Sequence, residues 1–413
     1  MNTLNKIKKI IIVSTILIIL GIFIYLLAIK KDPPITSTTI DGATTIQSAP
    51  AQKQTTVNGN KQYVYYQESQ QIDTNRVSPN AIVISWIVPN GLLANGYYLE
   101  TQTMNNNNEW SAWEKTDTEQ GNAKDTSSSD RQSVMLTVDS VDKFKYQFVY
   151  QQSSQNSIYI DPSTVKIELI NTKNGPSAQK NSIKNKISSL ISNKATADNN
   201  APRIITRAEW GAPTYRWPEL GWNIEYTKPE RFIIHHTADS AGNDTYATMR
   251  AIWYYHAYRG TPDDPSDDWG DIGYNYVIDP AGNIFQGRDY DPNIINQGGN
   301  EAVGAHAFYY NKNSIGISVM GNYSDINPAD AAFDSVAKLM GYKSNIHKLN
   351  PAENASFGLR TIGHRDVNAT ACPGDVFYAR LPELRGLALR YATNVFNSPY
   401  YGASNPPTLY YDQ

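Results

Sequence analysis

The sequence predicts an α/β (α+β) domain with a central mixed β-sheet flanked by helices, preceded by a β-sandwich domain and an N-terminal transmembrane helix. Three observations lead to this prediction. A long uncharged apolar run opens the chain, short β-branched and aromatic runs follow, and strand and helix patterns alternate in the C-terminal half. The 413 residues suffice for two folded domains beyond the first segment.

Residues 1–31 predict a cytoplasmic end and a transmembrane signal anchor. No charged residue occurs from Ile10 to Ile29, and lysines flank this run on both sides. About twenty helical residues cross the ~30 Å hydrocarbon core of a bilayer. The alternative is a cleaved signal peptide, which would have a shorter apolar stretch and a small-residue cleavage site, whereas this run ends in "LLAIKKD". We therefore expect a single-pass cell-membrane protein with the bulk of the chain outside the cell.

The next segments differ in composition. Residues 32–60 are rich in Thr, Ser and Pro without apolar periodicity, which predicts a flexible stalk. Residues 61–172 contain short runs such as "NAIVISWIVP" and "KFKYQFVYQQ", separated by turn-forming stretches, and this pattern is typical of an antiparallel β-sandwich. Residues 173–202 are polar and predict a linker. Residues 393–413 lack periodicity and predict a disordered tail.

The C-terminal domain, residues 203–392, mixes strand and helix signals. The run "RFIIHHT" is typical of a buried strand, and "YNYVIDPAGNIFQGRD" is typical of a hairpin. Apolar residues at helical spacing in "DTYATMRAIWYYHAYRG" predict a helix that ends at Gly260. A second helix is expected to begin with Asn327 as its N-cap and Pro328 in its first turn. The last helix is expected to be interrupted near Pro382.

Composition limits the possible partners and locates the chemistry. The net charge of −3 gives no basic surface for a nucleic acid. A single cysteine excludes an intramolecular disulfide, so each domain depends on its own core or on a metal. All six histidines and the cysteine lie within residues 203–392. We therefore expect this domain to carry the reaction alone, and the preceding domain to affect only targeting or reach.

The single cysteine, Cys372, lies in "GHRDVNATACPGD" together with His364, and "IIHHT" contains His235. A lone cysteine is most often a small buried hydrophobe. Zinc also accepts thiolate and imidazole ligands, and a catalytic zinc has three protein ligands and one open position. A nucleophilic cysteine paired with a histidine is the main rival of a zinc site. The residue types and spacing alone leave these uses open.

Among these uses of Cys372, a resemblance to a known family favours the zinc site. The segments "RAEWGA", "IIHHTA", "DIGYNYVIDPAGNIFQGR", "GAHA", "NSIGISVMGNY" and "GHRDVNATACPGD" occur in this order between residue 203 and about residue 390. They look like the peptidoglycan recognition protein family, the type 2 N-acetylmuramoyl-L-alanine amidase domain, which also resembles phage T7 lysozyme. The preceding domain is similar, much more weakly, to β-rich regions of some bacterial secreted amidases.

The resemblance implies roles for particular residues. His235, His364 and Cys372 match the family's zinc ligands, so Zn²⁺ is the expected cofactor. Tyr274 matches the tyrosine that catalytic members need for hydrolysis, and Thr370 lies where those members carry Thr or Lys. Members that only bind peptidoglycan typically lack the cysteine. The resemblance therefore implies a zinc-dependent N-acetylmuramoyl-L-alanine amidase, with a non-catalytic peptidoglycan-binding receptor as the alternative.

Other candidates are assigned to the substrate or to the fold. His306 in "GAHA" matches a groove position of the family, where substrate contact and a structural role are equally expected. Trp269 and Arg288 match positions near the peptide stem of the substrate. His236 follows His235 on a strand, points to the opposite face and is expected to be structural. The expected partner is peptidoglycan, and we expect a monomer held at the membrane by one helix, with its catalytic domain on the cell-wall side.

Overall fold

The computed structural model describes residues between 36 and 392, with longer gaps at 42–50, 117–130, 178–200, 259–267 and 289–299. The expected transmembrane anchor, most of the expected linker, the expected tail and Gly260 lie outside the described residues. Among the helices that are described, none combines the length and the apolar character needed to cross a membrane.

Two antiparallel sheets form the N-terminal part, and they share one hydrophobic core. The first has the strand order β1 (Thr36–Asp41), β10 (Lys166–Asn171), β5 (Ala81–Ile87) and β8 (Arg131–Thr137). The second has the order β2 (Ala51–Val57), β3 (Asn60–Glu68), β9 (Lys143–Gln152), β6 (Tyr97–Met104) and β7 (Glu114–Thr116), with β4 (Ile72–Asp73) beside β9.

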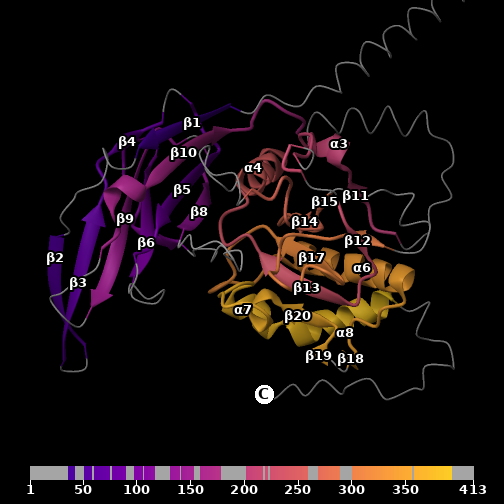
Figure 1. The fold of residues 1–413 in the computed structure, drawn as a ribbon. Coiled ribbons are helices and arrows are strands. Elements are labelled where there is room, and N and C mark those ends of the chain that lie inside the picture. Colours follow the sequence, from indigo (N-terminus) through magenta and orange to yellow (C-terminus); the bar gives the residue numbers. More distant parts are fainter. Residues whose placement is uncertain are drawn as a thin grey trace, which may run out of the picture.

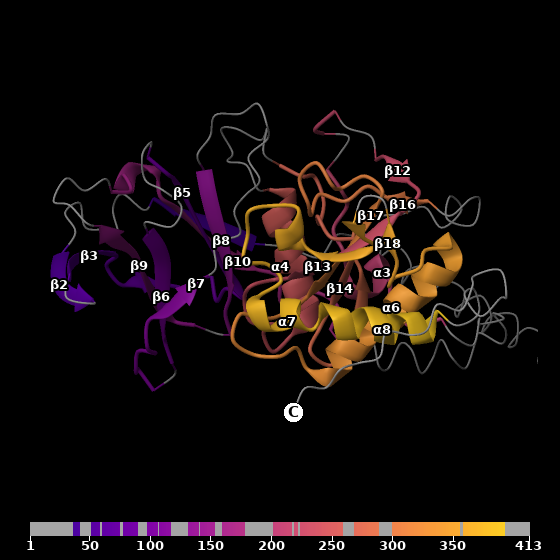
Figure 2. The ribbon, with the colours of Figure 1, turned by 90° about the horizontal axis from the view of Figure 1, so that it is seen from below.

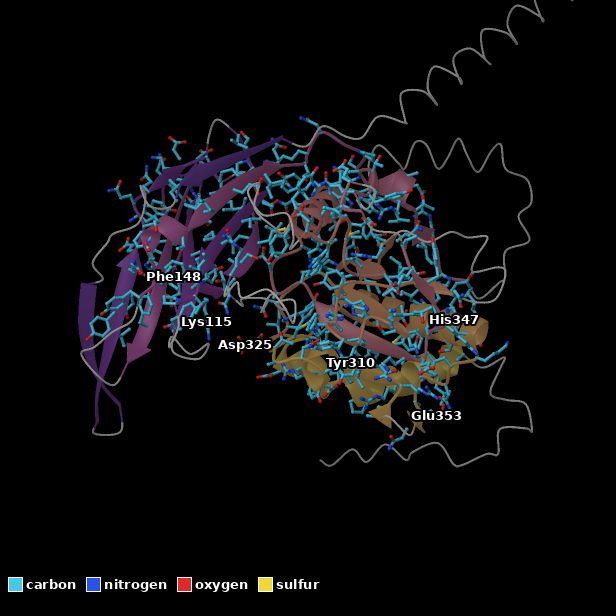
Figure 3. The ribbon with its side chains drawn as sticks, viewed as in Figure 1. Lys115, Phe148, Tyr310, Asp325, His347 and Glu353 are labelled. Atoms are coloured by element: carbon cyan, nitrogen blue, oxygen red, sulfur yellow. The ribbon has the colours of Figure 1, made fainter. Side chains whose placement is uncertain are left out.

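Large aromatic side chains hold these two sheets together. Trp86 of β5 meets Phe148 of β9 edge to face, with ring centroids 5.2 Å apart, and Phe148 can be located in Figure 3. Both side chains are fully buried. Such pairs bury much apolar area and have a preferred geometry, so they fix how the two sheets face each other.

The range expected to form a stalk, residues 32–60, differs from the prediction. It contains β1, which pairs with β10 along its whole length, and β2, which pairs with β3. Threonine is β-branched and suits a strand, and backbone hydrogen bonding to a neighbouring strand needs no apolar periodicity. The absence of apolar periodicity therefore did not exclude strands in this range.

The C-terminal part is built on a mixed six-stranded sheet, as predicted. Its order is β11 (Ile204–Ile205), β15 (Ile284–Gln286), β14 (Tyr276–Ile278), β17 (Ser314–Val319), β13 (Arg231–His236) and β20 (Thr361–Gly363). Only the β14–β15 hairpin is antiparallel among these pairs. Two short ladders are separate from it: β12 (Tyr226–Thr227) with β16 (Glu301–Ala302), and β18 (Asn354–Ala355) with β19 (Gly358–Leu359).

Helices cover both faces of this sheet, which confirms the predicted flanking (Figure 1). On one face, α4 (Thr245–Ala257) packs with the short α3 (Arg207–Trp210). On the other face lie α6 (Asp330–His347) and α8 (Leu381–Tyr391), preceded by the short α7 (Asp375–Ala379). Pro382 lies in the first turn of α8, so the predicted interruption of the last helix is confirmed.

One predicted boundary was wrong. The helix α6 begins at Asp330 with Ala329 as its N-cap, not with Asn327, and no side chain caps it. Asp330 in the first turn places a negative charge at the positive end of the helix dipole, which supports a later start.

The N-terminal sheets also pack against the C-terminal part. Met135 and Val83 of the four-stranded sheet share a hydrophobic cluster with Met249 and Ile252 of α4. In both ribbon views β8 and β10 lie beside α4 (Figures 1 and 2). The helix α4 is therefore covered on two sides, by its own sheet and by the N-terminal sheet.

Candidate metal centre

Two neighbouring strands bring the two predicted histidine ligands together. The strand β13 pairs with β20 in parallel, with Ile234 opposite Gly363. The next residue on each chain is His235, at the end of β13, and His364, the first residue of the 3-10 turn η4 (His364–Asp366). Because the carboxyl ends of parallel strands meet at one sheet edge, both imidazoles emerge at the same place.

Cys372 completes the group from the loop before α7. The ligand atoms of His235, His364 and Cys372 all lie within 4.8 Å of one another. The Cys372 sulfur lies 3.8 Å from Nδ1 of His235 and accepts a hydrogen bond of 3.3 Å from the backbone amide of His236. The side chain is buried. A backbone donor aimed at the sulfur favours its anionic, metal-binding form.

The second nitrogen of each histidine has a protein partner. Nε2 of His364 lies 3.1 Å from Oδ1 of Asn368, and Nε2 of His235 lies 3.0 Å from Nδ1 of His306. These contacts leave Nδ1 of both histidines for a ligand. Metal-binding histidines usually donate their other N–H to such a partner, which fixes the ring orientation. Nε2 of His306 in turn lies 3.3 Å from the hydroxyl of Ser314, so the His235 ring is held by a short chain of contacts.

Burial keeps these imidazoles neutral. Burial, reinforced by His364 and His306, holds the pKa of His235 well below its ordinary value. Burial also lowers the pKa of His306 to about 3 and that of His364 to about 4. Neutral imidazole is the form that binds a metal ion, so the histidines need not lose a proton to do so at neutral pH.

His236 faces the other side of β13, as predicted. Its Nδ1 accepts a hydrogen bond from the Tyr323 amide at 3.3 Å, and burial lowers its pKa to about 3. Its described contacts are therefore those of a structural residue.

Tyr274 lies beside His235, one of the three candidate ligands. Its ring centroid is 5.3 Å from that of His235, and its side chain is buried. A close backbone approach holds this segment: a Cβ on Gly287 would lie 2.2 Å from the Tyr274 carbonyl oxygen, so only glycine fits there. Thr370 accepts a 3.1 Å hydrogen bond from the Cys372 amide, which shapes the loop that carries the sulfur.

The chain is similar in sequence to known proteins over its C-terminal part. A family model described as N-acetylmuramoyl-L-alanine amidase matches residues 225–375. Peptidoglycan-recognition protein SC1a/b of Drosophila simulans is 33% identical over 175 residues, which are 41% of this chain and 80% of that protein. The N-acetylmuramoyl-L-alanine amidase of Homo sapiens is 30% identical over 189 residues, 43% of this chain and 27% of that protein. The solved structure of Drosophila peptidoglycan recognition protein SD covers 43% of this chain and 92% of that chain, with 28% identity and a TM-score of 0.35.

The chain belongs to the peptidoglycan recognition protein and type 2 N-acetylmuramoyl-L-alanine amidase family. The 33% identity to the Drosophila simulans protein, over 80% of that protein, decides the family membership.

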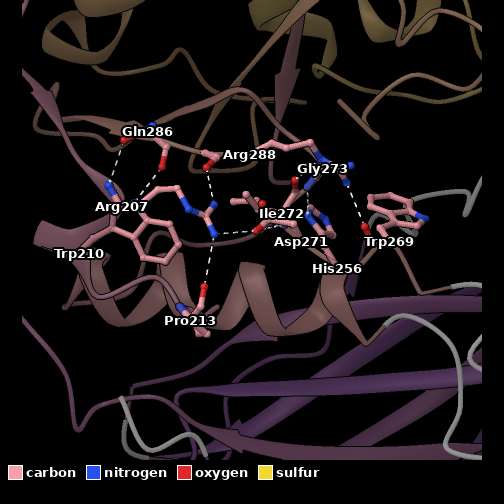
Figure 4. Close-up of polar contacts among 11 residues, drawn as sticks. Arg207, Trp210, Pro213, His256, Trp269, Asp271, Ile272, Gly273, Gln286 and Arg288 are labelled. Carbon is pink, nitrogen blue, oxygen red and sulfur yellow. Dashed lines mark hydrogen bonds and ion pairs between the residues drawn. The ribbon is translucent and has the colours of Figure 1, made fainter. Parts of the chain in front are cut away.

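In this family member two of the three residues expected to touch substrate, His306 and Arg288, are buried, and the third, Trp269, is half-buried. His306 is 4% exposed, and its ring nitrogens lie near Nε2 of His235 and the hydroxyl of Ser314. Arg288 is 6% exposed and donates from Nε to the Ile272 carbonyl at 2.9 Å and from Nη2 to the Trp269 carbonyl at 3.2 Å (Figure 4). Trp269 is half-buried.

Two residues of this amidase-family domain were missed by sequence reasoning. The side-chain oxygen of Asn368 contacts Nε2 of His364. The only sign of this contact in the sequence was an asparagine four residues after the histidine. His256, which sequence reasoning left without a role, accepts a 3.1 Å hydrogen bond from the Gly273 amide (Figure 4). Its ring centroid lies 5.3 Å from that of Tyr274. His256 therefore positions the segment that carries Tyr274.

The donor set fits zinc. Two neutral imidazole nitrogens and one thiolate sulfur are ligands that zinc accepts, and three protein ligands leave a position open for water or substrate, as in catalytic zinc sites. Within the described residues, this is the one group of three or more His, Cys, Asp or Glu whose ligand atoms converge in this way.

Proposed function

We propose that this protein is a zinc-dependent N-acetylmuramoyl-L-alanine amidase, which hydrolyses the amide bond between N-acetylmuramic acid and L-alanine in peptidoglycan. The convergence of His235, His364 and Cys372 within 4.8 Å carries the proposal. Zinc held by these residues would supply Lewis-acid chemistry, polarising the amide carbonyl and lowering the pKa of the attacking water.

The residues around the ligands have separate tasks in this proposal. His306 and Asn368 hold the two imidazoles with Nδ1 directed at the metal position. The Tyr274 hydroxyl donates a hydrogen bond to the negative charge that develops on the substrate carbonyl oxygen, where a fixed donor lowers the barrier most. Thr370 keeps the Cys372 loop in shape by accepting from the Cys372 amide, and in this proposal its hydroxyl donates to the substrate.

Two other functions compete with this proposal, a non-catalytic receptor and a cysteine amidohydrolase, and one assay separates all three. The purified full chain is assayed for bound zinc and then incubated with peptidoglycan, and the soluble products are identified by mass spectrometry. Free stem peptides that begin with alanine, lost on chelation and restored by zinc, are the expected result. Binding to peptidoglycan without peptide release would make the protein a receptor. Activity that survives chelation but is lost on alkylation of Cys372 would make it a cysteine amidohydrolase.

We also place the enzyme on the cell-wall side of the cell membrane, held by a helix within residues 1–31. The uncharged run from Ile10 to Ile29 supports this placement, as does the location of peptidoglycan outside the membrane. Protease added to cells with a permeable wall should degrade the C-terminal domain while the membrane stays intact. Full protection of that domain would contradict the placement.

A further inference from the structure

A small pocket adjoins the candidate metal centre, and part of its wall comes from the N-terminal sheet. Val134 and Met135 of β8 line it together with Ile252 and Tyr255 of α4 and with Tyr274. The pocket therefore joins residues that are far apart in sequence. No part of the family match, residues 225–375, includes β8.

The strand β8 is held against α4 by specific contacts. Side chains alternate along a strand, so Val134 joins the core between the two N-terminal sheets while Met135 joins the cluster that contains α4. The Ser133 hydroxyl lies 2.8 Å from the Tyr255 hydroxyl, and both are buried. The Thr137 amide also donates to the Asp239 carboxylate, just beyond β13. These bonds fix Met135 relative to the pocket.

The pocket reaches the reacting region through Tyr274. That side chain lines the pocket, and its ring centroid lies 5.3 Å from that of His235. His256 also lines the pocket and lies 5.3 Å from Tyr274. A group inside the pocket would therefore contact the same tyrosine that lies beside His235.

The size and lining of the pocket select its occupant. Its volume is about 20 Å³, and a cavity of roughly 10–15 Å³ on this measure admits one water-sized group. Met135 and Ile252 supply apolar wall, and Thr237, Tyr255, His256 and Tyr274 add polar groups. Apolar atoms make the larger part of the lining, which disfavours a charged group. A methyl group has the right size and polarity.

The scissile amide of the proposed substrate carries two such groups. One is the methyl of the lactyl unit, on the carbonyl side, and the other is the side chain of L-alanine, on the nitrogen side. We propose that the pocket receives a methyl substituent next to the scissile amide, so that Met135 of the N-terminal sheet determines substrate specificity. This inference rests on the proposed amidase function.

The test compares matched substrates and matched variants of the full, zinc-loaded chain. The reference substrate is an N-acetylmuramoyl peptide. One analogue has glycine in place of L-alanine, and a second has a glycolyl unit in place of the lactyl unit. Losing one methyl from a fitted apolar pocket costs about 10-fold or more in kcat/KM. We expect the wild-type chain to discriminate by this factor against one of the two analogues, which identifies the methyl that is bound.

Met135→Phe fills the pocket, and Met135→Ala enlarges it. We expect Met135→Phe to lose about 10-fold in kcat/KM on the reference substrate while keeping its activity on the analogue that lacks the bound methyl. Met135→Ala should lose the preference for the methyl and accept an ethyl group at that position. Val83→Ala is the control, because Val83 is the partner of Met135 in the β5–β8 register and belongs to the same cluster without lining the pocket.

The ratio of kcat/KM on the reference substrate to kcat/KM on the analogue separates a change in specificity from a general loss of structure. A variant that has merely lost structure loses both activities together, and bound zinc and the melting temperature report such a loss directly. An unchanged ratio in both Met135 variants overturns the inference while leaving the amidase proposal intact. A zinc-loaded wild-type chain that releases no peptide overturns the amidase proposal. In that case the pocket is tested by the ratio of the binding affinities for the reference substrate and the analogue. An unchanged ratio in both Met135 variants overturns the inference.

Discussion

At the scale of single residues, the Tyr274 hydroxyl is the sharpest test of the proposed chemistry. Tyr274→Phe keeps the ring that lies beside His235 and removes only the donor. If the hydroxyl stabilises the developing oxyanion, turnover should fall by about 10²–10³. Bound zinc should stay unchanged, because that oxygen is not among the ligands. Peptide release and metal content, measured on the same sample, check the expectation.

Tyr276→Phe is the matched control. Strand alternation predicts that Tyr274 and Tyr276 share a face, but Tyr274 precedes β14 and joins the cluster on the α4 side, whereas Tyr276 joins the opposite one. The Tyr276 hydroxyl donates to buried Glu301 at 3.3 Å, so its loss should lower stability by about 1 kcal/mol and leave turnover near normal. Near-normal turnover of a zinc-loaded Tyr274→Phe would refute the catalytic role.

Cys372→Ser tests the metal assignment. Serine keeps the shape of the side chain but replaces a thiolate by a hydroxyl that stays protonated at neutral pH, so it is a poor zinc ligand. We expect loss of most bound zinc and of all measurable activity. Metal analysis after dialysis gives the answer, and stoichiometric zinc in this variant contradicts the assignment.

Asn368→Ala tests the support of His364. Removing a partner that orients a metal-binding histidine weakens metal affinity by about 10–100-fold. Competition with a chelator of known affinity measures this change in the full chain. Wild-type affinity would show that the 3.1 Å contact between Asn368 and Nε2 of His364 does not matter for the metal.

The sequence was sufficient to propose the ligands but not their supports. His235, His364 and Cys372 could be named because the short segments that contain them resemble those of a known family, whereas residue types and spacing alone left a zinc site and a nucleophilic cysteine open. The contact between His306 and His235 could not, because it joins residues 71 positions apart and depends on how the loop before β17 folds. A histidine in a glycine-rich segment gives no sign of which side it will face.

At the scale of elements, a buried ionic cluster joins α6 to β16. Glu301 accepts from Lys343 Nζ at 2.6 Å and from His347 Nε2 at 2.9 Å, and all three residues are at most 4% exposed. Burial alone would raise the pKa of Glu301, but Lys343 and His347 outweigh it and hold that pKa below its ordinary value. The carboxylate is therefore charged in the fold, and its contacts fix the end of α6 against the short β12–β16 ladder.

This cluster predicts that the free energy of unfolding falls as the solution becomes acidic. A carboxyl group with a depressed folded pKa contributes stability that is present above its unfolded value, near 4.5, and is lost as the pH falls through the folded value. Glu301→Gln should cost about 3–5 kcal/mol at neutral pH, because it leaves buried Lys343 without its counter-charge. The loss of stability below pH 4.5 should become shallower. Urea unfolding at several pH values measures both effects, and an unchanged fall in the free energy of unfolding at acid pH in the variant contradicts the role of Glu301.

Element types were more predictable than element ends. The mixed sheet follows from the apolar strands and the hairpin, and the break near Pro382 follows from proline chemistry. The start of α6 at Asp330 did not follow, because Asn327 offers a side-chain cap that the backbone does not use. A helix end is set by several weak local preferences, and here the acidic Asp330 in the first turn accompanies the later start.

At the scale of the whole molecule, the two parts are joined by more than a linker. Arg250 of α4 is fully buried and donates to the carbonyls of Thr172 at 2.9 Å, Pro176 at 2.9 Å and Trp210 at 2.7 Å. It thus ties the end of β10 and the segment after it to α3 and α4. The expectation that the C-terminal domain works independently does not take this shared core into account, because apolar patterns do not reveal which surface of an element meets another domain.

Arg250→Ala should therefore destabilise both parts together. Two buried carbonyls and one partly buried carbonyl lose their donor, and we expect a cost of about 2–4 kcal/mol. Calorimetry should show one cooperative transition in the wild-type chain and a lower melting temperature in the variant. Two separate transitions in the wild-type chain would show instead that the parts unfold independently.

The pairing of β1 with β10 bears on how far the enzyme can reach. A free stalk over residues 32–60 would let the catalytic part range roughly 100 Å from the membrane. With β1 incorporated in the first sheet from Thr36 on, only residues 32–35 separate that sheet from the expected anchor, a span of about 14 Å. We expect so short a connection to keep the proposed amidase close to the membrane and to restrict cleavage to the part of the wall nearest to it.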